Sequence, residues 1–257
     1  MKRIFACLAV SSVLISAYAG PSASGVFTAP SSIPAELISF INANKKEFLA
    51  DFDAVLKADT DGLLVLVDKK HPLDPSFKPS DLVPVKAGRS YTASRDGLSL
   101  RAPAEAALDG MARAAKRDGI TLVASSTFRD YAYQKKLYER NVRELGKAKA
   151  DRESAPPGMS QHQLGTAVDF GSITDDFAFT KAGKWLSAHA SDSGWSLSFP
   201  AGYEKVTGYR AECWHYRYVG KEAAAFQKKW FADVQQYMIE FIDAWKKSGL
   251  ADGKNPS

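Results

Sequence analysis

Residues 160–169 read Ser-Gln-His-Gln-Leu-Gly-Thr-Ala-Val-Asp, and this stretch decides the fold that we expect. Gly165 and the β-branched residues after it favour a turn that leads into a strand rather than a helix. His162 and Asp169 are seven residues apart, a spacing that would align them on a helix but not across a turn and a strand. The stretch therefore predicts a strand from Thr166 to Phe170, with tertiary structure bringing His162 and Asp169 together.

A second stretch, residues 212–220, reads Glu-Cys-Trp-His-Tyr-Arg-Tyr-Val-Gly. From Trp214 onward, aromatic residues alternate with other types, which is the period of a strand. Glu212 and His215 are three residues apart and would point to opposite faces of a flat strand. We therefore expect a turn or bulge before Trp214 that lets both side chains reach one site.

Together the two stretches offer two imidazoles and two carboxylates, which is enough for a catalytic zinc site. Three nitrogen or oxygen ligands leave the fourth tetrahedral position to water, whereas a structural site closes with four ligands and favours thiolates. An unligated glutamate can then take a proton from that water while the metal polarises a carbonyl. A lone histidine is more often packed or exposed than metal-bound, so the prediction rests on the combination.

Two further segments complete a pattern that resembles a known family. They are Leu-Val-Leu-Val-Asp-Lys-Lys-His-Pro-Leu at 64–73 and Ser-Thr-Phe-Arg-Asp-Tyr at 126–131, the latter followed by Gln134. With the two stretches above, they are similar to the VanY-like zinc D,D- and L,D-carboxypeptidases of bacterial cell walls, whose fold is shared with the hedgehog signalling domain. The resemblance spans roughly residues 63–220. It implies an α+β fold, with a small antiparallel sheet and helices packed around it in one catalytic domain.

The resemblance also implies roles for single residues. It assigns one zinc ion to His162, Asp169 and His215, with Glu212 as the general base. Arg129 matches the arginine that holds the substrate carboxylate or the developing oxyanion, a task that suits its forked donors. By the same resemblance, the residues lining the substrate pocket are Gln134, Ser160 and Trp214. The plainer alternatives are a buried polar network for the ligands, a partner of a ligand for Glu212 and a salt bridge for Arg129.

The sequence departs from the family pattern at three places. Gln161 replaces the usual Glu, Phe128 replaces the usual Tyr, and Ser-Phe-Pro at 198–200 replaces Arg-Tyr-Pro. None of these changes removes a ligand or the base. They affect the expected substrate preference.

The implied function is zinc-dependent hydrolysis of the C-terminal D-alanine from peptidoglycan stem peptides, with D,D and L,D specificity both open. Two alternatives remain: a cell-wall endopeptidase of the same fold, and a zinc-stabilised wall-binding module that does not cleave. The presence of Glu212 argues against the module. A third hypothesis, a thiol protease using Cys213, is disfavoured because a lone cysteine usually packs and nothing near it in sequence would lower its pKa.

The first 19 residues predict export. Lys2 and Arg3 precede an apolar run that ends in Ala-Tyr-Ala at 17–19, the pattern of a cleaved signal peptide. We expect a periplasmic or cell-envelope protein, in contact with a membrane only through an uncleaved signal. The expected divisions are a signal at 1–19, a flexible leader at 20–33, a helical extension at 34–60, the catalytic domain at 61–248 and a tail at 249–257.

The charge limits the partners that we expect. The formal net charge is +5, from 34 basic and 29 acidic residues. Loss of two basic residues with the signal would leave 32 minus 29, or +3, which is too mild to indicate nucleic acid. We expect a monomer whose partners are stem peptides.

Periodicity predicts the other elements. The chain should form one helix from Pro34 to Leu56, a buried strand from Leu63 to Val67 and an irregular loop through Pro84. It should then form a helix from Pro103 to Arg117, a helix capped by Asp130, a polar loop from Gly146 to Met159 and a final helix from Glu222 to Trp245.

Overall fold

The computed structural model describes residues 12–13, 27–86 and 88–249. The expected signal peptide and tail, and the first part of the expected leader, lie outside these residues, apart from Ser12, Val13 and Gly249. Within the described ranges, no helix is long and apolar enough to cross a membrane.

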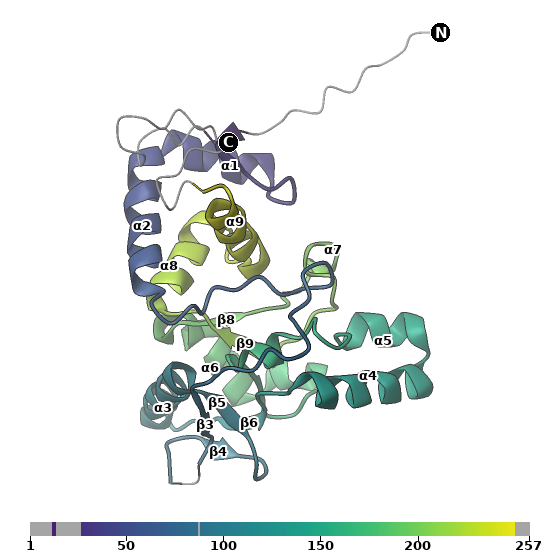
Figure 1. Cartoon of the computed structure of the whole chain (residues 1–257). Helices are drawn as coiled ribbons and strands as arrows, with labels where there is room; N and C mark the ends of the chain where they lie inside the picture. Colours follow the sequence, from purple (N-terminus) through teal and green to yellow (C-terminus); the bar gives the residue numbers. More distant parts are fainter. Residues whose placement is uncertain (1–11, 14–26, 87, 250–257) are drawn as a thin grey trace.

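A five-stranded sheet in the order β4-β6-β7-β9-β8 forms the centre of the molecule (Figure 1). Its strands are β4 (Thr92–Ala93), β6 (Val123–Ser126), β7 (Ala167–Phe170), β9 (His215–Tyr218) and β8 (Trp195–Leu197). The pairs β6–β7, β7–β9 and β8–β9 are antiparallel, as expected. The edge pair β4–β6 is parallel, so the sheet is mixed rather than purely antiparallel. A crossover through β5 and α3 joins β4 to β6, and a connection of that length permits parallel pairing.

Two short antiparallel pairs lie outside this sheet. Strand β3 (Leu82–Pro84) pairs with β5 (Ser99–Arg101), and β1 (Ser12–Val13) pairs with β2 (Phe27–Thr28). The segment expected to be irregular through Pro84 therefore ends in a strand. Pro84 is the last residue of that strand, where a missing backbone N–H is tolerated.

Two groups of buried apolar residues make the core. The sheet cluster joins the central sheet to α3 (Ala102–Arg117) and α6 (Lys181–His189), and includes Leu108, Met111, Phe170, Trp195 and Tyr216. The helical cluster is formed by α1 (Ala35–Ala43), α2 (Lys45–Ala58), α8 (Lys221–Trp230) and α9 (Gln235–Lys247), which lie together at one end in Figure 1. It includes Phe48, Phe52, Phe226, Trp230, Phe241 and Trp245.

The remaining helices are short or peripheral: α4 (Tyr131–Leu145), α5 (Lys147–Glu153), α7 (Glu204–Thr207), and the 3-10 helices η1 (Gln161–Leu164), η2 (Asp175–Phe179) and η3 (Ala190–Ser193). The predicted helix ending at Arg117 is confirmed, with proline in its first turn. The predicted cap of α4 is also confirmed, because the Asp130 carboxylate accepts from the Tyr133 amide.

Two helix predictions are wrong in their extent, and one predicted loop contains a helix. The N-terminal helix is interrupted at Asn44, whose side chain donates to the Phe40 carbonyl, a local bond that competes with a continuing helix. The final helix is divided between α8 and α9 by a turn in which Ala232 and Asp233 have positive φ values of 51° and 59°. The polar loop after Gly146 contains α5.

The predicted strand from Leu63 to Val67 is also wrong. Its apolar side chains are buried at Leu63, Leu64 and Val67, as the pattern indicated. However, the carbonyls of Leu63 and Val65 accept hydrogen bonds from Arg217 Nη2, at 2.7 and 2.9 Å. A side chain of β9 therefore satisfies two carbonyls of this segment, and Asp59 Oδ1 accepts from the amides of Leu63 and Leu64.

Candidate metal centre and active site

The turn that carries His162 is η1, directly before β7. The Ser160 hydroxyl accepts from the His162 amide at 3.3 Å, and Gly165 ends the turn in the left-handed region with φ of 69°. A Cβ on Gly165 would lie 2.9 Å from a side-chain carbon of Leu82, so both space and conformation favour glycine. The predicted turn into a strand is confirmed.

The expected turn before Trp214 is present as well. The His215 amide donates to the Glu212 carbonyl at 3.2 Å, and β9 begins at His215. Asp169 on β7 lies directly opposite His215 on β9. Sheet register and this turn therefore bring Glu212, Asp169 and His215 to one place.

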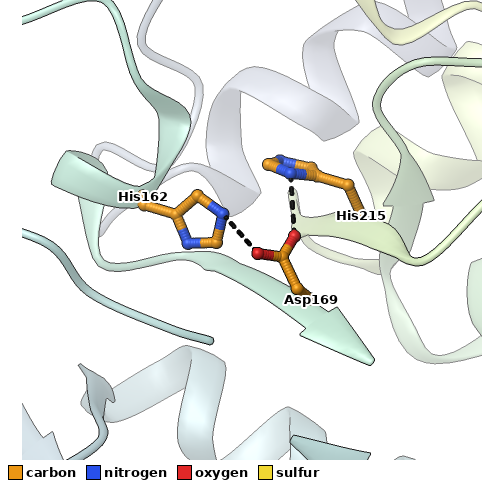
Figure 2. Close-up of side chains that lie close together, drawn as sticks. All are labelled: His162, Asp169 and His215. Atoms are coloured by element: carbon orange, nitrogen blue, oxygen red, sulfur yellow. Dashed lines mark ion pairs between the residues drawn. The ribbon is translucent and has the colours of Figure 1, made fainter. Parts of the chain in front are cut away.

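Three side chains converge there (Figure 2). Candidate ligand atoms of His162, Asp169 and His215 all lie within 4.8 Å of one another. His162 Nε2 is 3.2 Å from Asp169 Oδ2, and His215 Nδ1 is 3.1 Å from Asp169 Oδ1. Glu212 Oε2 is 3.4 Å from His215 Nδ1. All four residues are buried.

The donor atoms of this cluster fit a metal ion. His162 Nδ1 donates to the Thr127 carbonyl at 2.7 Å, which leaves Nε2 to face the cluster without a hydrogen bond. Asp169 Oδ1 is buried and also has no hydrogen-bond partner. Buried polar atoms are rarely left without a partner, and two imidazole nitrogens with one carboxylate oxygen form a known ligand set of catalytic zinc.

The two histidines of the cluster have pKa values shifted in opposite directions. Burial, with Arg129 nearby, lowers the pKa of His162 to about 4. Burial also acts to lower the pKa of His215, but the neighbouring carboxylates of Asp169 and Glu212 outweigh it and raise that pKa to about 9. Burial opposes ionisation of Asp169, yet the two histidines hold its pKa well below the usual value. Without metal, one imidazolium therefore faces two acidic side chains.

Arg129 lies beside the cluster in a fixed orientation. Its Nη1 donates to Ser126 Oγ at 2.6 Å and lies 3.6 Å from Asp169 Oδ2, while its Nε donates to Gln134 Oε1 at 2.9 Å. Gln134 is fully buried and donates in turn to the Ala155 carbonyl. Gln134 therefore lies behind the guanidinium and orients it, in place of the expected position on the pocket wall.

A cavity of about 320 Å³ opens at this site. Seven of the eight residues predicted for the site line it: Arg129, Ser160, His162, Asp169, Glu212, Trp214 and His215. The Arg210 guanidinium lies over the Trp214 ring, with 5.2 Å between its central carbon and the ring centroid. Two guanidinium groups, the cluster of His162, Asp169 and His215, and the Glu212 carboxylate thus line one cavity.

Several residues of the site had no functional signal in the sequence. Thr127 acts through its backbone carbonyl, which any residue could supply. The ring centroids of Phe199 and His215 are 4.7 Å apart, and the sequence marked Phe199 only as part of a departure from the family pattern.

The thiol-protease hypothesis for Cys213 is disfavoured by its surroundings. Cys213 lies near the carbonyls of Thr174 and Asp175, and burial raises the pKa of its thiol, which disfavours a nucleophilic thiolate.

Comparison with known proteins places this geometry in a family. Residues 97–221 match the family model described as VanY, D-alanyl-D-alanine carboxypeptidase. The YodJ protein of Bacillus subtilis is 36% identical over 193 residues, which cover 73% of this chain and 69% of the relative. The chain belongs to the VanY family. All the residues proposed for the site lie within the matched region.

Solved structures of VanY-like enzymes share the fold. The LdcB LD-carboxypeptidase, from a structure concerned with peptidoglycan recognition, is 33% identical with a TM-score of 0.63, covering 70% of this chain and 86% of its own. A variant of the D,D-pentapeptidase VanY in complex with Zn(II) is 26% identical with a TM-score of 0.56, covering 69% and 98%. These structures agree with the α+β fold predicted from the motifs.

Proposed function

We propose that this protein is a zinc-dependent carboxypeptidase that removes the C-terminal D-alanine from peptidoglycan stem peptides. The observation that carries the proposal is the buried cluster of His162, Asp169 and His215, which opens into the same cavity as Glu212 and Arg129. Family membership supports the reaction, and the similarity to a zinc complex supports the metal.

The side chains have distinct tasks in this mechanism. His162 through Nε2, His215 through Nδ1 and the Asp169 carboxylate would hold the ion. When bound, zinc supplies Lewis acidity and lowers the pKa of water. Glu212 takes a proton from the attacking water as its oxygen bonds to the scissile carbonyl carbon. The same carboxyl then gives that proton to the leaving amine as the C–N bond breaks.

Arg129 supports a carboxypeptidase over an endopeptidase. Its side chain lines the cavity, and burial lowers its pKa because the charged form loses solvation. A buried guanidinium is stabilised by a paired anion, and the forked donors match a carboxylate. The free C-terminal carboxylate of a stem peptide is such an anion. An endopeptidase substrate would bring an uncharged amide to this position.

Glu212 supports an enzyme over a non-catalytic binding module. Its carboxylate lies 3.4 Å from a candidate ligand nitrogen and faces the cavity, where a general base must lie. A module that only needed zinc for stability would have no use for this fourth acidic or basic side chain.

We further propose that the signal at 1–19 exports the chain to the cell envelope, where its substrates occur.

Hydrolysis of defined muropeptides tests the proposal. Protein stripped with a chelator and protein reloaded with zinc are each incubated with a pentapeptide ending in D-Ala-D-Ala and with the corresponding tetrapeptide. Mass spectrometry should show loss of one terminal alanine with the reloaded protein only. The preferred peptide gives the D,D or L,D specificity. Equal cleavage of a C-terminally amidated peptide would favour an endopeptidase, and no cleavage of any peptide would favour the binding module.

A further inference from the structure

The second imidazole of the cluster is held from behind by a side chain that the reaction does not use. His215 directs Nδ1 toward Asp169 and Glu212, while its Nε2 lies 3.2 Å from Gln161 Oε1. For Nδ1 to offer a lone pair to a metal, the proton of neutral His215 must be on Nε2. Gln161 can accept that proton in a hydrogen bond only if its amide oxygen, and not its amide nitrogen, faces the ring.

The orientation of the Gln161 amide is set by Gln235 and Ser198. Gln161 Oε1 accepts from Ser198 Oγ at 2.7 Å, and Gln161 Nε2 donates to Gln235 Oε1 at 3.1 Å. Gln235 Nε2 donates to Ser198 Oγ at 3.2 Å. If the Gln161 amide were turned over, its oxygen would face the Gln235 oxygen with no proton between them. Its NH₂ group would then face His215 Nε2.

This ring of hydrogen bonds is buried, and of its three side chains Gln161 alone lines the cavity. The exposed fractions are 7% for Gln161, 2% for Ser198, 2% for Gln235 and 4% for His215. Water therefore has little access to replace a lost partner, and a mismatch within the ring would leave buried polar atoms unsatisfied.

The turn between α8 and α9 places Gln235. Gln235 is the first residue of α9 and follows the two positive-φ residues Ala232 and Asp233. Gln227 holds this turn, because its Nε2 donates to the carbonyl and to the carboxylate of Asp233, at 3.1 and 2.9 Å. The Ser196 hydroxyl of β8 donates to Gln227 Oε1 at 2.9 Å. The strained turn is thus tied to the central sheet.

We propose that Gln235 is a positioning residue which, through the Gln161 amide, holds His215 in the tautomer that presents Nδ1 to the metal. Gln235 lies outside residues 97–221, the part of the chain that matches the family model. The helical end of the molecule therefore supplies part of the metal centre's support. The inference rests on the proposed function only in requiring that the cluster binds zinc.

Zinc affinity of the full chain, measured by competition with a chromophoric chelator, tests this role. Gln235→Met removes the oxygen that fixes Gln161, and should weaken zinc binding by about 10- to 100-fold, the range seen when outer partners of zinc ligands are changed. The matched control is Gln236→Met. Gln236 is the next residue of α9, is also buried, and donates to Asp68 instead of reaching the site. That control should keep wild-type affinity even if its unfolding temperature falls.

A double variant separates positioning from general damage. Gln161→Glu offers an oxygen toward His215 in either orientation and needs no partner to fix it. Added to Gln235→Met, it should restore zinc affinity to within a few-fold of wild type, which loss of packing alone would not allow. If Gln235→Met does not fold, Gln235→Asn withdraws the same oxygen by one methylene.

The outcomes separate this inference from the proposed function. Wild-type zinc affinity in Gln235→Met, or a loss that Gln161→Glu does not restore, would overturn the positioning role. Either result would leave hydrolysis by the wild-type enzyme untouched. Conversely, a wild-type protein that binds zinc but cleaves no muropeptide would contradict the proposed function, while the affinity series still tests Gln235.

Discussion

The helical cluster and the sheet cluster differ in the residues that form them and in their relation to the candidate site. The helical cluster is formed by the two ends of the described chain and is rich in aromatic rings, with Phe48 in contact with five others. The sheet cluster also has a buried apolar core, but β7 and β9 direct Asp169 and His215 into a cavity. Most of the chemistry therefore belongs to the sheet, and most of the aromatic packing to the helices.

The difference shows how the sheet region can hold buried charge. Titratable groups at the site have partners from neighbouring elements, such as the Thr127 carbonyl for His162 and Gln134 for Arg129. The helical cluster reaches the site through Gln235, which is a neutral amide. If this division holds, changes in the two regions should have separable effects on zinc binding, turnover and stability.

The largest expected effect comes from the base. Glu212→Gln keeps the size of the side chain but cannot take a proton, so kcat should fall roughly 100- to 10,000-fold. Zinc content, measured by mass spectrometry of the metal, should stay at one ion per chain. Glu204→Gln is the control, because Glu204 pairs with Arg152 at the surface. Turnover that survived in Glu212→Gln would remove Glu212 from the mechanism.

A matched pair of phenylalanines tests the division directly. Phe48 and Phe170 are both fully buried, one in each cluster. Phe48→Ala and Phe170→Ala should each lower the free energy of unfolding by about 3–5 kcal/mol. Only Phe170→Ala should also weaken zinc binding, because Phe170 follows Asp169 on β7. Chemical denaturation measures the loss of stability, and zinc titration measures the affinity. If Phe48→Ala and Phe170→Ala bound zinc with the same affinity, the two clusters would not have separable effects.

Arg129 should be the residue that makes the enzyme prefer substrates with a free C-terminal carboxylate. Arg129→Lys keeps the charge but loses the forked geometry, and should lower kcat/KM on a peptide acid by about 10- to 100-fold, matching about 1.5–3 kcal/mol for a charged hydrogen bond. The amidated peptide, already a poor substrate, should be affected much less. An equal loss on both peptides would show that Arg129 does not bind the terminal carboxylate.

The smallest expected effect is a pH-dependent contact between Asp68 and α9. Burial acts to raise the pKa of Asp68, but hydrogen bonds from the Lys70 amide, His71 and Gln236 of α9 outweigh it and lower the pKa below 3.8. The charged form therefore stabilises the fold above pH 3.8, and this contribution is lost as the pH falls through the lowered pKa. Asp68→Asn should cost about 1 kcal/mol at pH 6 and less at pH 2–3, measured by urea unfolding. A constant difference across this range would contradict the assignment.

Local patterns predicted the part of the fold that local forces determine. The cap at Asp130, the helix ending at Arg117 and the strand entering at Gly165 each depend on residues close in sequence. The failures involved partners far away. Leu63–Val67 has the composition of a strand, but the Arg217 side chain, 154 residues beyond Leu63, donates hydrogen bonds to the carbonyls of Leu63 and Val65. The turn at Ala232 and Asp233 depends on the Gln227 side chain, which no helical period reveals.

In the candidate site, too, features set by residues close in sequence could be predicted, and features set by distant partners could not. The meeting of His162, Asp169, His215 and Glu212 in one cavity could be predicted because each lies in a short stretch whose chemistry is unusual. Gln134 was expected to line the pocket, whereas the structure places it behind Arg129. Gln161 could be noted only as a substitution, because its partner Gln235 is 74 residues away. The contacts that connect Gln235 and Gln161 to His215 arise only from the tertiary structure.

Measuring activity as a function of added zinc is the sharpest test of whether His162, Asp169 and His215 hold a catalytic ion. Metal-free protein is titrated with zinc while the release of terminal alanine from the preferred stem peptide is followed. The cluster of His162, Asp169 and His215 predicts a rate that rises until one zinc ion is bound per chain and then stops rising. It also predicts no rise for His215→Ala. Alanine release that is independent of zinc, or that survives in His215→Ala, would contradict the metal centre proposed for this protein.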